Sequence, residues 1–421
     1  MAIGTTTTLL IGWLRDDVAL AAVGLTTLLV WIADGLFQAS GIAATAMVAR
    51  FLGRGDPEMA KRVAAQALLL GVLAALLATV VLIPLVDDIL RLMGGSPGVV
   101  EQGTRYMRVI LLTSVFSFPV AVASGVMRGA GDTRTPMLVV LVMNLWNAVA
   151  SYLLVFGGGP VPMLGLRGAA IAVSSARTLG GFLMLGALFT GFGGIRLSPR
   201  LLLRWDGDLA ARLLRLAFPN LGEQAVQRVG YVLFMRIIAS LGTAALAAHQ
   251  IAVQVESVSF MSGWGFAMAA STLTGQALGA GQVDMAEKSV RRILLFSCSF
   301  MGLMGLLFAG AGPQIVRVFG ATPQVLALAG VALQVSALGQ WGMAISMGLS
   351  GSLRGAGDTR TPLYVSLFGV LCFRVAVVYL FAVVFGWGLP GVWGAMTVDW
   401  SGRAILIVFL FRRGRWKTVE V

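Results

Sequence analysis

Residues 128–136 of the chain read Arg-Gly-Ala-Gly-Asp-Thr-Arg-Thr-Pro, and residues 354–362 read the same. The two copies lie 226 residues apart (354 − 128). Nine identical residues do not recur in order by chance, so the chain contains an internal duplication. A period of this length is too long for a solenoid repeat, and the repeated unit is therefore one half of the protein.

The same offset relates segments far from this stretch. Residues 19–22 (Ala-Leu-Ala-Ala) recur at residues 245–248, and Gly53 recurs as Gly279. The offset is 226 residues for both pairs, so the alignment of the two halves needs no insertion or deletion between them. We therefore expect the two halves to share one fold.

The composition is that of an integral membrane protein. Of the 421 residues, 58% are hydrophobic and 12% are charged, whereas charged residues make up about a quarter of a soluble domain. The apolar stretches reach the roughly 20 residues that cross a bilayer as a helix. None shows the short alternating pattern of a transmembrane barrel. We predict an all-α integral membrane fold.

Cysteine, histidine and net charge exclude several classes of function. Cys298 and Cys372 lie inside apolar runs, which favours packing roles over a disulfide or metal site. His249 is the only histidine, so a histidine metal centre is disfavoured, and we expect no cofactor. The net charge of +13 marks one side of a membrane rather than a surface for nucleic acid.

The segment before residue 15 is apolar but too short for a complete span. The seventh span begins near Leu213, and subtracting the period puts the start of its partner about 13 residues before Met1 (213 − 226). We expect the first helix to be truncated or the start to be assigned too late.

Twelve spans are predicted, six in each half. After the partial first helix they are expected at residues 19–49, 62–86, 98–127, 134–157, 166–191, 213–240, 245–276, 288–311, 324–353, 360–386 and 390–411. Six spans return the chain to its starting side, so a pseudo-two-fold axis along the membrane normal should relate the halves. We predict an N-terminal lobe (1–193), a connector on the cytoplasmic membrane surface (194–210) and a C-terminal lobe (211–421).

The loops on one side carry most of the arginines and lysines, including those at residues 50–62, 196–215 and 412–417. By the positive-inside rule this side is cytoplasmic. Both termini and both copies of the duplicated stretch should then lie in the cytoplasm.

The duplicated stretch has the features of a turn between two helices. Arg128 can meet free carbonyls at a helix end, and Gly129 and Gly131 allow left-handed backbone. Asp132 or a neighbouring threonine can cap the next helix, with Pro136 in its first turn. This reading is favoured over substrate contact, and a phosphate loop is disfavoured because no lysine follows at Walker spacing.

Three motifs together resemble the multidrug and toxic compound extrusion (MATE) transporters. They are the duplicated loop, Ala-Ala-His-Gln at residues 247–250, and Leu-Thr-Gly-Gln-Ala-Leu-Gly-Ala-Gly at residues 273–281. The resemblance covers essentially the whole chain. It implies two six-helix lobes, alternating access, and export of amphipathic or cationic compounds in exchange for protons or sodium ions.

The coupling residues of that family carry over only in part. The position of the family's first-helix aspartate is occupied by Thr7, and its fifth-helix asparagines are matched by Asn144 and Asn147. Ser151 occupies the acidic position that follows. Residues 144, 147 and 151 share one helical face, which suits a cleft lining or a hydrogen-bonded seam equally.

Other branches of the family use a glutamate in the seventh helix. The matching position here is Gln227, and Glu223 lies one turn earlier. With Gln224 and Tyr231 these residues form a polar stripe that, facing the cleft, could take up and release a proton. The alternative is that Arg228 or Arg215 holds Glu223 in an ion pair, a contact that would be structural.

Three further acids lie within predicted spans, where a carboxylate is a functional candidate by default. Glu256 is interpreted as a coupling residue, against a structural ion pair with Arg236 or Arg374. Asp399 and Arg403, four residues apart, can satisfy each other, and structure and coupling are equally favoured.

The third acid, Asp34, is the only deep acid of the N-terminal half. It is a coupling candidate that could compensate for the missing acid at Thr7, and it could pair with Arg177. His249 is expected to cap or pack rather than to relay protons.

We therefore predict a monomeric secondary transporter of a bacterial inner membrane, with small-molecule substrates, no nucleic-acid partner and no enzymatic activity. A lipid-linked precursor flippase remains an alternative, because Arg177, Arg236 and the cleft candidate Arg374 could bind phosphates. A membrane enzyme is disfavoured because no nucleophile–base pair or metal cluster is visible, and a non-transporting remnant is the remaining option.

Overall fold

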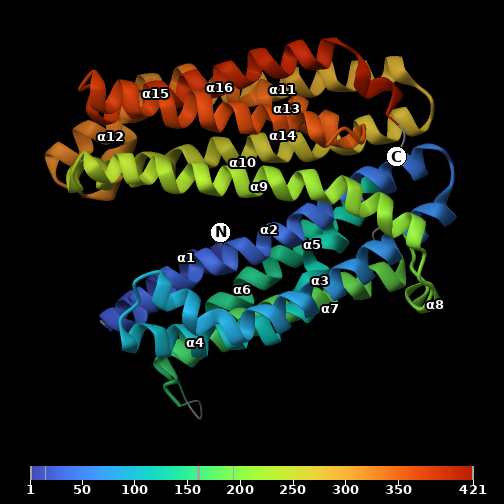
Figure 1. Ribbon diagram of the computed structural model, residues 1–421, viewed down its shortest axis with the longest axis horizontal. Helices are drawn as coiled ribbons and strands as arrows, with labels where there is room; N and C mark the ends of the chain where they lie inside the picture. The colour runs from blue at the N-terminus through green and yellow to red at the C-terminus, as the bar shows by residue number, and fades with distance from the viewer. Residues whose placement is uncertain (1, 15, 159–161, 193, 420–421) are drawn as a thin grey trace. The chain divides into compact units, whose positions relative to one another are not determined.

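The computed structural model describes residues 2–14, 16–158, 162–192 and 194–419, and every regular element among them is a helix (Figure 1). The first half contains α1 (Ala2–Trp13), α2 (Asp17–Gly53), α3 (Pro57–Leu92), α4 (Pro97–Leu112), α5 (Ser114–Gly129), α6 (Arg134–Phe156), α7 (Gly165–Thr190) and α8 (Pro199–Leu202). The second half contains α9 (Gly207–Ser240), α10 (Thr243–Gly279), α11 (Val283–Val316), α12 (Pro323–Ser336), α13 (Gln340–Gly355), α14 (Arg360–Phe368), α15 (Ala376–Tyr379) and α16 (Gly388–Arg412).

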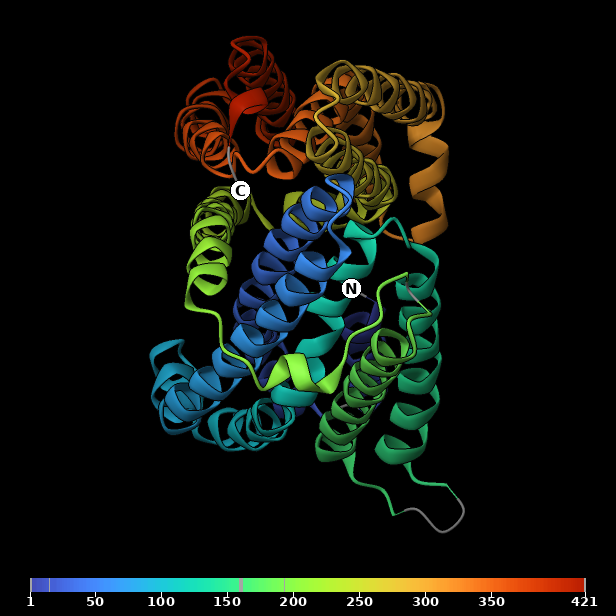
Figure 2. The same cartoon turned by 90° about the vertical axis from the view of Figure 1, so that its right-hand side faces the viewer.

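The chain forms two compact units. The first comprises Met1–Val48 and Pro57–Leu214, and the second comprises Ala49–Asp56 and Arg215–Val421. Within each unit the long helices run alongside one another (Figures 1 and 2). Apart from the short segment Ala49–Asp56, the chain passes from the first unit to the second inside α9. A separate connector at 194–210 therefore stays a prediction from sequence.

The apolar helices have the lengths that a bilayer requires. Among the described residues, seven are long and apolar enough to cross a membrane, and eight if the bent pair α4–α5 is one span. The helices α9 and α10 have 34 and 37 residues and are not among these seven. Glu223 lies on α9 and Glu256 on α10, so each of the two helices carries one of the four candidate acids.

The duplication is visible in how the helices pack. A Cβ added at Gly125 of α5 would overlap the backbone of Gly41 in α2, and one added at Gly351 of α13 would overlap that of Ala267 in α10. The two contacts are related by the offset of 226 residues. Each half therefore builds its bundle on the same close backbone approach, which only a residue without a side chain permits.

Two spans differ between the halves. The predicted span 98–127 is two helices, α4 and α5, bent by 57° at Thr113. Pro119 follows this bend within two turns and removes a helical hydrogen-bond donor. Its counterpart in the second half is Ile345, which keeps that donor. In the second half, the span after Arg360 contains two π-helical segments, Gly369–Val375 and Leu380–Val384, where α6 is uninterrupted.

The first copy of the duplicated stretch forms the expected turn, with one correction. Gly131 has φ of 91°, as does the matching glycine of the second copy, whereas Gly129 is part of α5 and has no left-handed backbone. Asp132 caps the following helix, because its Oδ1 accepts hydrogen bonds from the backbone N–H groups of Arg134 (2.9 Å) and Thr135 (3.1 Å). The expectation for Gly129 was wrong because that glycine serves close helix packing instead.

Candidate coupling site

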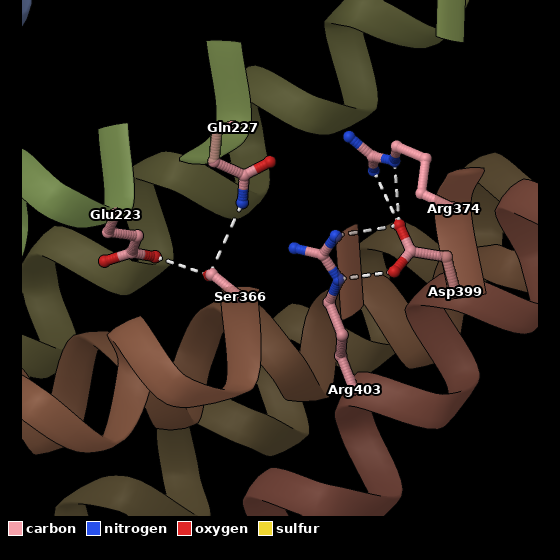
Figure 3. Close-up of polar contacts among 6 residues, drawn as sticks. All are labelled: Glu223, Gln227, Ser366, Arg374, Asp399 and Arg403. Atoms are coloured by element: carbon pink, nitrogen blue, oxygen red, sulfur yellow. Dashed lines mark hydrogen bonds and ion pairs between the residues drawn. The ribbon is translucent and has the colours of Figure 1, made fainter. Parts of the chain in front are cut away.

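Glu223 of α9 lies at the centre of a hydrogen-bonded network in the second unit (Figure 3). Nη2 of Arg354 contacts both carboxylate oxygens, at 2.8 and 2.7 Å, and the Ser366 hydroxyl donates to Oε1 at 2.9 Å. Gln227, one turn along α9, donates to the Ser366 oxygen at 3.4 Å. The Glu223 side chain is 12% exposed. Its charge is therefore compensated within the unit.

The cation that holds Glu223 is not one that the sequence suggested. Neither Arg228 nor Arg215 forms that ion pair; Arg354, from the second copy of the duplicated stretch, does. Arg354 lies at the end of α13 and is 6% exposed. The arginine of the duplicated stretch thus binds a carboxylate of another helix in this half, beyond its expected role of meeting free carbonyls.

Asp399 of α16 binds two arginines at once (Figure 3). Arg403 donates from Nε to Oδ1 at 2.5 Å and from Nη2 to Oδ2 at 3.0 Å. Arg374, in the π-helical segment Gly369–Val375, donates from Nε to Oδ2 at 2.9 Å. The predicted pairing of Asp399 with Arg403 is confirmed. The second arginine, reached from a π-helix, was not expected.

The surroundings of Asp399 fix this arrangement. Asp399 is fully buried and Arg403 is 2% exposed. Gly369 makes room for the Arg403 guanidinium, because a Cβ there would overlap it. Both guanidinium groups lie over the Trp400 ring, 5.8 Å (Arg374) and 5.5 Å (Arg403) from its centroid. A carboxylate with two cations and no solvent contact is a poor candidate for cyclic release of an ion.

Glu256 of α10 has a different environment. Its hydrogen-bond partner is Gln340, whose Nε2 donates to Oε1 at 3.5 Å, and Oε1 of Gln340 in turn accepts from the Ser259 hydroxyl at 2.5 Å. Among the described residues, no cation lies within 4.0 Å of Glu256. The alternative ion pair with Arg236 or Arg374 is therefore not formed.

The acids of the second unit act on one another through the arginines. The charge of Arg374 acts on Glu256, and Arg403 is acted on by Asp399, Arg374 and Glu223. The three acids lie on three helices, and each has its own set of contacts in the second unit.

The first unit contains a simpler arrangement. Arg177 of α7 and Asp34 of α2 form a two-pronged ion pair, Nη1–Oδ1 at 3.0 Å and Nη2–Oδ2 at 3.1 Å, which confirms the predicted pairing. The two side chains are 20% and 39% exposed.

The polar face of α6 is only partly assembled. Asn147 and Ser151 are fully buried and hydrogen-bonded to each other at 3.3 Å. Asn144 instead donates to the Val140 carbonyl of its own helix at 2.8 Å. Thr7 is also buried, at 2% exposure. Both hydrogen bonds lie within α6 itself, so the choice between a cleft lining and a seam between helices stays a prediction from sequence.

The other polar candidates lie outside the hydrogen-bonded network around Glu223. His249 is buried between the rings of Phe234 and Trp393, 5.4 and 5.6 Å away, so it packs as expected. Gln224 and Tyr231 do not enter the network around Glu223, and Tyr231 is 39% exposed. The polar stripe of α9 is therefore narrower than predicted.

Three residues of the site were missed in the sequence: Arg354, Ser366 and Gln340. Arg354 had a signal, since it is one of the few charged residues preserved by the duplication. Ser366 and Gln340 are neutral, lie on other helices and have non-polar or small counterparts in the first half, Val140 and Ser114. No spacing rule within one helix could have found them.

Comparison with known proteins gives a consistent result. The family model MatE matches residues 1–153 and 219–380. The probable multidrug resistance protein NorM of Thermotoga maritima is 29% identical, over 95% of this chain and 86% of the relative. The multidrug resistance protein PmpM of Pseudomonas aeruginosa is 28% identical, over 94% of this chain and 84% of the relative.

The fold also matches a solved structure of MATE in the bent conformation. The TM-score is 0.90 at 22% sequence identity, over 98% of this chain and 91% of that chain. The architecture is thus the twelve-helix fold of these transporters, reached here with α4–α5, α12–α13 and α14–α15 each forming one span.

Proposed function

We propose that this chain, which belongs to the MatE family of membrane transporters, exports amphipathic or cationic small molecules, drugs among them, in exchange for protons or sodium ions. The names of two relatives, both multidrug resistance proteins, support drugs as cargo. Members of this family are transporters and not enzymes. An ion gradient is the energy source, since the sequence contains no Walker-type nucleotide motif.

One observation carries the assignment of the coupling residue. Asp34, Glu223 and Asp399 each have an arginine within 3.0 Å, whereas Glu256 has no cation within 4.0 Å among the described residues. A carboxylate inside a membrane is unfavourable unless it is paired or neutralised. Glu256 therefore needs a mobile cation, and a proton or a sodium ion supplies it.

The exchange follows from that requirement. With the ion bound, Glu256 is neutral and is held by Gln340, which Ser259 orients. When the ion leaves, the bare carboxylate attracts a cationic substrate. Binding of one cation thus excludes the other, and alternation of the site between the two sides of the membrane turns the exclusion into antiport.

The acids Glu223 and Asp399 are already bound to arginines. Arg354, Arg374 and Arg403 balance Glu223 and Asp399 with one positive charge in excess. Each of these groups has a partner of opposite charge, so we assign the exchange of cations to Glu256.

The flippase alternative is less well supported. A carrier of lipid-linked phosphates needs arginines that are free to bind an anion. Arg177 is bound to Asp34, and Arg374 is bound to Asp399. Both guanidinium groups already contact a carboxylate, which supports a cationic or amphipathic cargo, whereas Arg236 forms no ion pair among the described residues.

The proposed setting is a bacterial inner membrane, crossed many times by a monomer with both termini in the cytoplasm. The asymmetry of arginines and lysines between the loops supports this orientation. The bacterial relatives support the membrane.

Transport by the purified protein in liposomes tests the proposal. Ethidium movement is followed by fluorescence while a proton or a sodium gradient is imposed separately. We expect one gradient to drive ethidium movement by the wild type, and Glu256→Gln to reduce the driven rate at least about tenfold, because the amide binds neither ion.

The matched control is Glu58→Gln, which changes an exposed acid at the start of α3. It should transport like the wild type. Wild-type rates in Glu256→Gln would contradict the assignment of the residue, and absence of gradient-driven movement in every variant would contradict the exporter function.

A further inference from the structure

The short helix α8 contributes to the lining of two hollows in the first unit. One is a cavity of about 450 Å³ lined by Arg62, Gln66, Leu201, Arg204, Trp205, Asp206, Gly207 and Asp208. The other is an apolar groove of about 270 Å³ lined mainly by α3, α5 and α7, with Leu202 of α8. Figure 2 shows α8 as a short helix between α7 and α9. Neither hollow belongs to the coupling site.

The polar cavity contains an unsatisfied acceptor. Gln66 is 2% exposed, and its Nε2 donates to the Arg204 carbonyl at 2.5 Å. Its Oε1 is buried and has no hydrogen-bond donor among the described residues. An orphaned buried acceptor is unfavourable, so a ligand with an N–H or O–H group would be stabilised there.

The charges around that acceptor are of both signs. Arg62 and Arg204 supply guanidinium groups that bind phosphate. Asp208 supplies a carboxylate, which an anionic ligand would avoid and an ammonium group would seek. One carboxylate oxygen of Asp206 already accepts from the Leu209 N–H at 3.1 Å. The cavity therefore suits a zwitterion that carries a phosphate and a primary ammonium.

The apolar groove lies next along α3. Its residues Leu69 and Val72 follow Gln66 by one to two turns, about 5 to 9 Å along the helix axis. Its walls are entirely carbon-rich, and Phe116 and Phe182 line it with rings 5.9 Å apart. The groove suits a hydrocarbon chain that descends from a headgroup in the polar cavity.

The surface of the same segment has the character of a membrane interface. Leu203 is 88% exposed and Trp205 is 58% exposed, beside Arg200 and Arg204. Exposed apolar and tryptophan side chains next to arginines are typical of a helix that lies at headgroup level.

We propose that α8 and the start of α9 bind one phosphatidylethanolamine molecule. Its phosphate contacts Arg62 and Arg204, its ammonium donates to Asp208 and to Oε1 of Gln66, and one acyl chain occupies the groove beside Val72. The inference is independent of transport, because every residue that it uses lies outside the acids of the second unit.

Lipid retention measured by native mass spectrometry tests the proposal. Delipidated full-length protein in detergent is titrated separately with dioleoyl phosphatidylethanolamine, phosphatidylcholine and phosphatidylglycerol. Phosphatidylcholine keeps the phosphate but has no N–H donor, and phosphatidylglycerol lacks the cation. We expect one molecule of phosphatidylethanolamine to bind about tenfold more tightly than either.

Three variants localise the site. Arg62→Ala with Arg204→Ala should weaken phosphatidylethanolamine binding about tenfold or more, whereas the control Arg291→Ala with Arg292→Ala, on the exposed start of α11, should not. Asp208→Asn, an isosteric change at an exposed position, should remove the preference for phosphatidylethanolamine over phosphatidylglycerol. It serves as the test if the double variant fails to fold.

The groove is tested by Val72→Trp, which should weaken binding of the dioleoyl lipid and leave that of dihexanoyl phosphatidylethanolamine unchanged. Equal binding of all three lipids, or equal losses in the α11 control, would show an ordinary annular lipid and overturn the proposal. A preference for phosphatidylglycerol in the wild type would also overturn it, in favour of an anionic-lipid site.

Discussion

The two halves have an arginine at the same position of the repeat, but the carboxylate that binds it comes from a different position in each half. Arg177 and Arg403 are related by the 226-residue offset, each in the last long helix of its half. Arg177 reaches across to Asp34 of α2, whereas Arg403 binds Asp399 of its own helix. The counterpart of Asp34 is Phe260, and that of Asp399 is Val173. The acid has a different origin in each half.

The difference shows which features the duplication retained. The arginine, the glycine contacts and the capped turn recur in both halves. Glu256 has Val30 as its counterpart, and Arg374 has Ala148. The shared features build two similar bundles. The chemistry that we assign to ion exchange rests on residues that only the second half has.

The largest expected effect comes from removing the acid of each pair. Asp399→Asn leaves two buried guanidinium groups facing each other, and we expect it to destabilise the second unit by about 3 to 5 kcal/mol. Asp34→Asn breaks a half-exposed pair and should reduce stability by about 1 kcal/mol or less. Thermal unfolding in detergent measures both. Equal losses would contradict the contrast between a locked and a solvated pair.

A smaller effect, equal in the two halves, is expected at the glycine contacts. Gly125→Ala and Gly351→Ala each push a methyl group into a neighbouring backbone, at a cost of about 1 to 3 kcal/mol. Gly186→Ala and Gly310→Ala are the matched controls, because nothing lies within 4 Å of the added atom. The controls should be neutral or slightly stabilising. A large loss of stability in only one of Gly125→Ala and Gly351→Ala would contradict the structural equivalence of the two glycine contacts.

The smallest effect is expected at the caps of the duplicated turn. Asp358 accepts from the Thr361 N–H at 3.0 Å and from its hydroxyl at 2.6 Å. Asp358→Ala and Asp132→Ala should each reduce stability by about 1 kcal/mol. Replacement by Asn, which keeps an acceptor, should recover most of that loss. Unfolding midpoints of the four variants give the comparison.

Most of the fold followed from the sequence. Hydropathy and the repeat predicted the long helices, with ends within about a turn or two of those observed, as for 134–157 against α6. The bend at Thr113 and the π-helix around Arg374 were not predicted. Both depend on backbone hydrogen bonding and on contacts with other helices, which a window along one segment does not register.

The candidate site was also predicted only in part. Contacts within a helix, such as Asp399 with Arg403, followed from residue spacing, and the pairing of Asp34 with Arg177 followed from the scarcity of deep charges. The partner of Glu223 did not, because the sequence contains nearer arginines than Arg354. In a chain with an excess of arginines, only packing decides which of them meets a given acid.

Counting the ion displaced by substrate is the most direct test of the assignment to Glu256. Ethidium is added to the purified protein in weakly buffered solution, and released protons are read with an indicator dye and released sodium ions with an electrode. We expect the wild type and Glu223→Gln to release about one ion, proton or sodium, per ethidium bound. Glu256→Gln should bind ethidium more weakly, and the ethidium that it binds should displace neither ion. Undiminished release from Glu256→Gln would contradict the account.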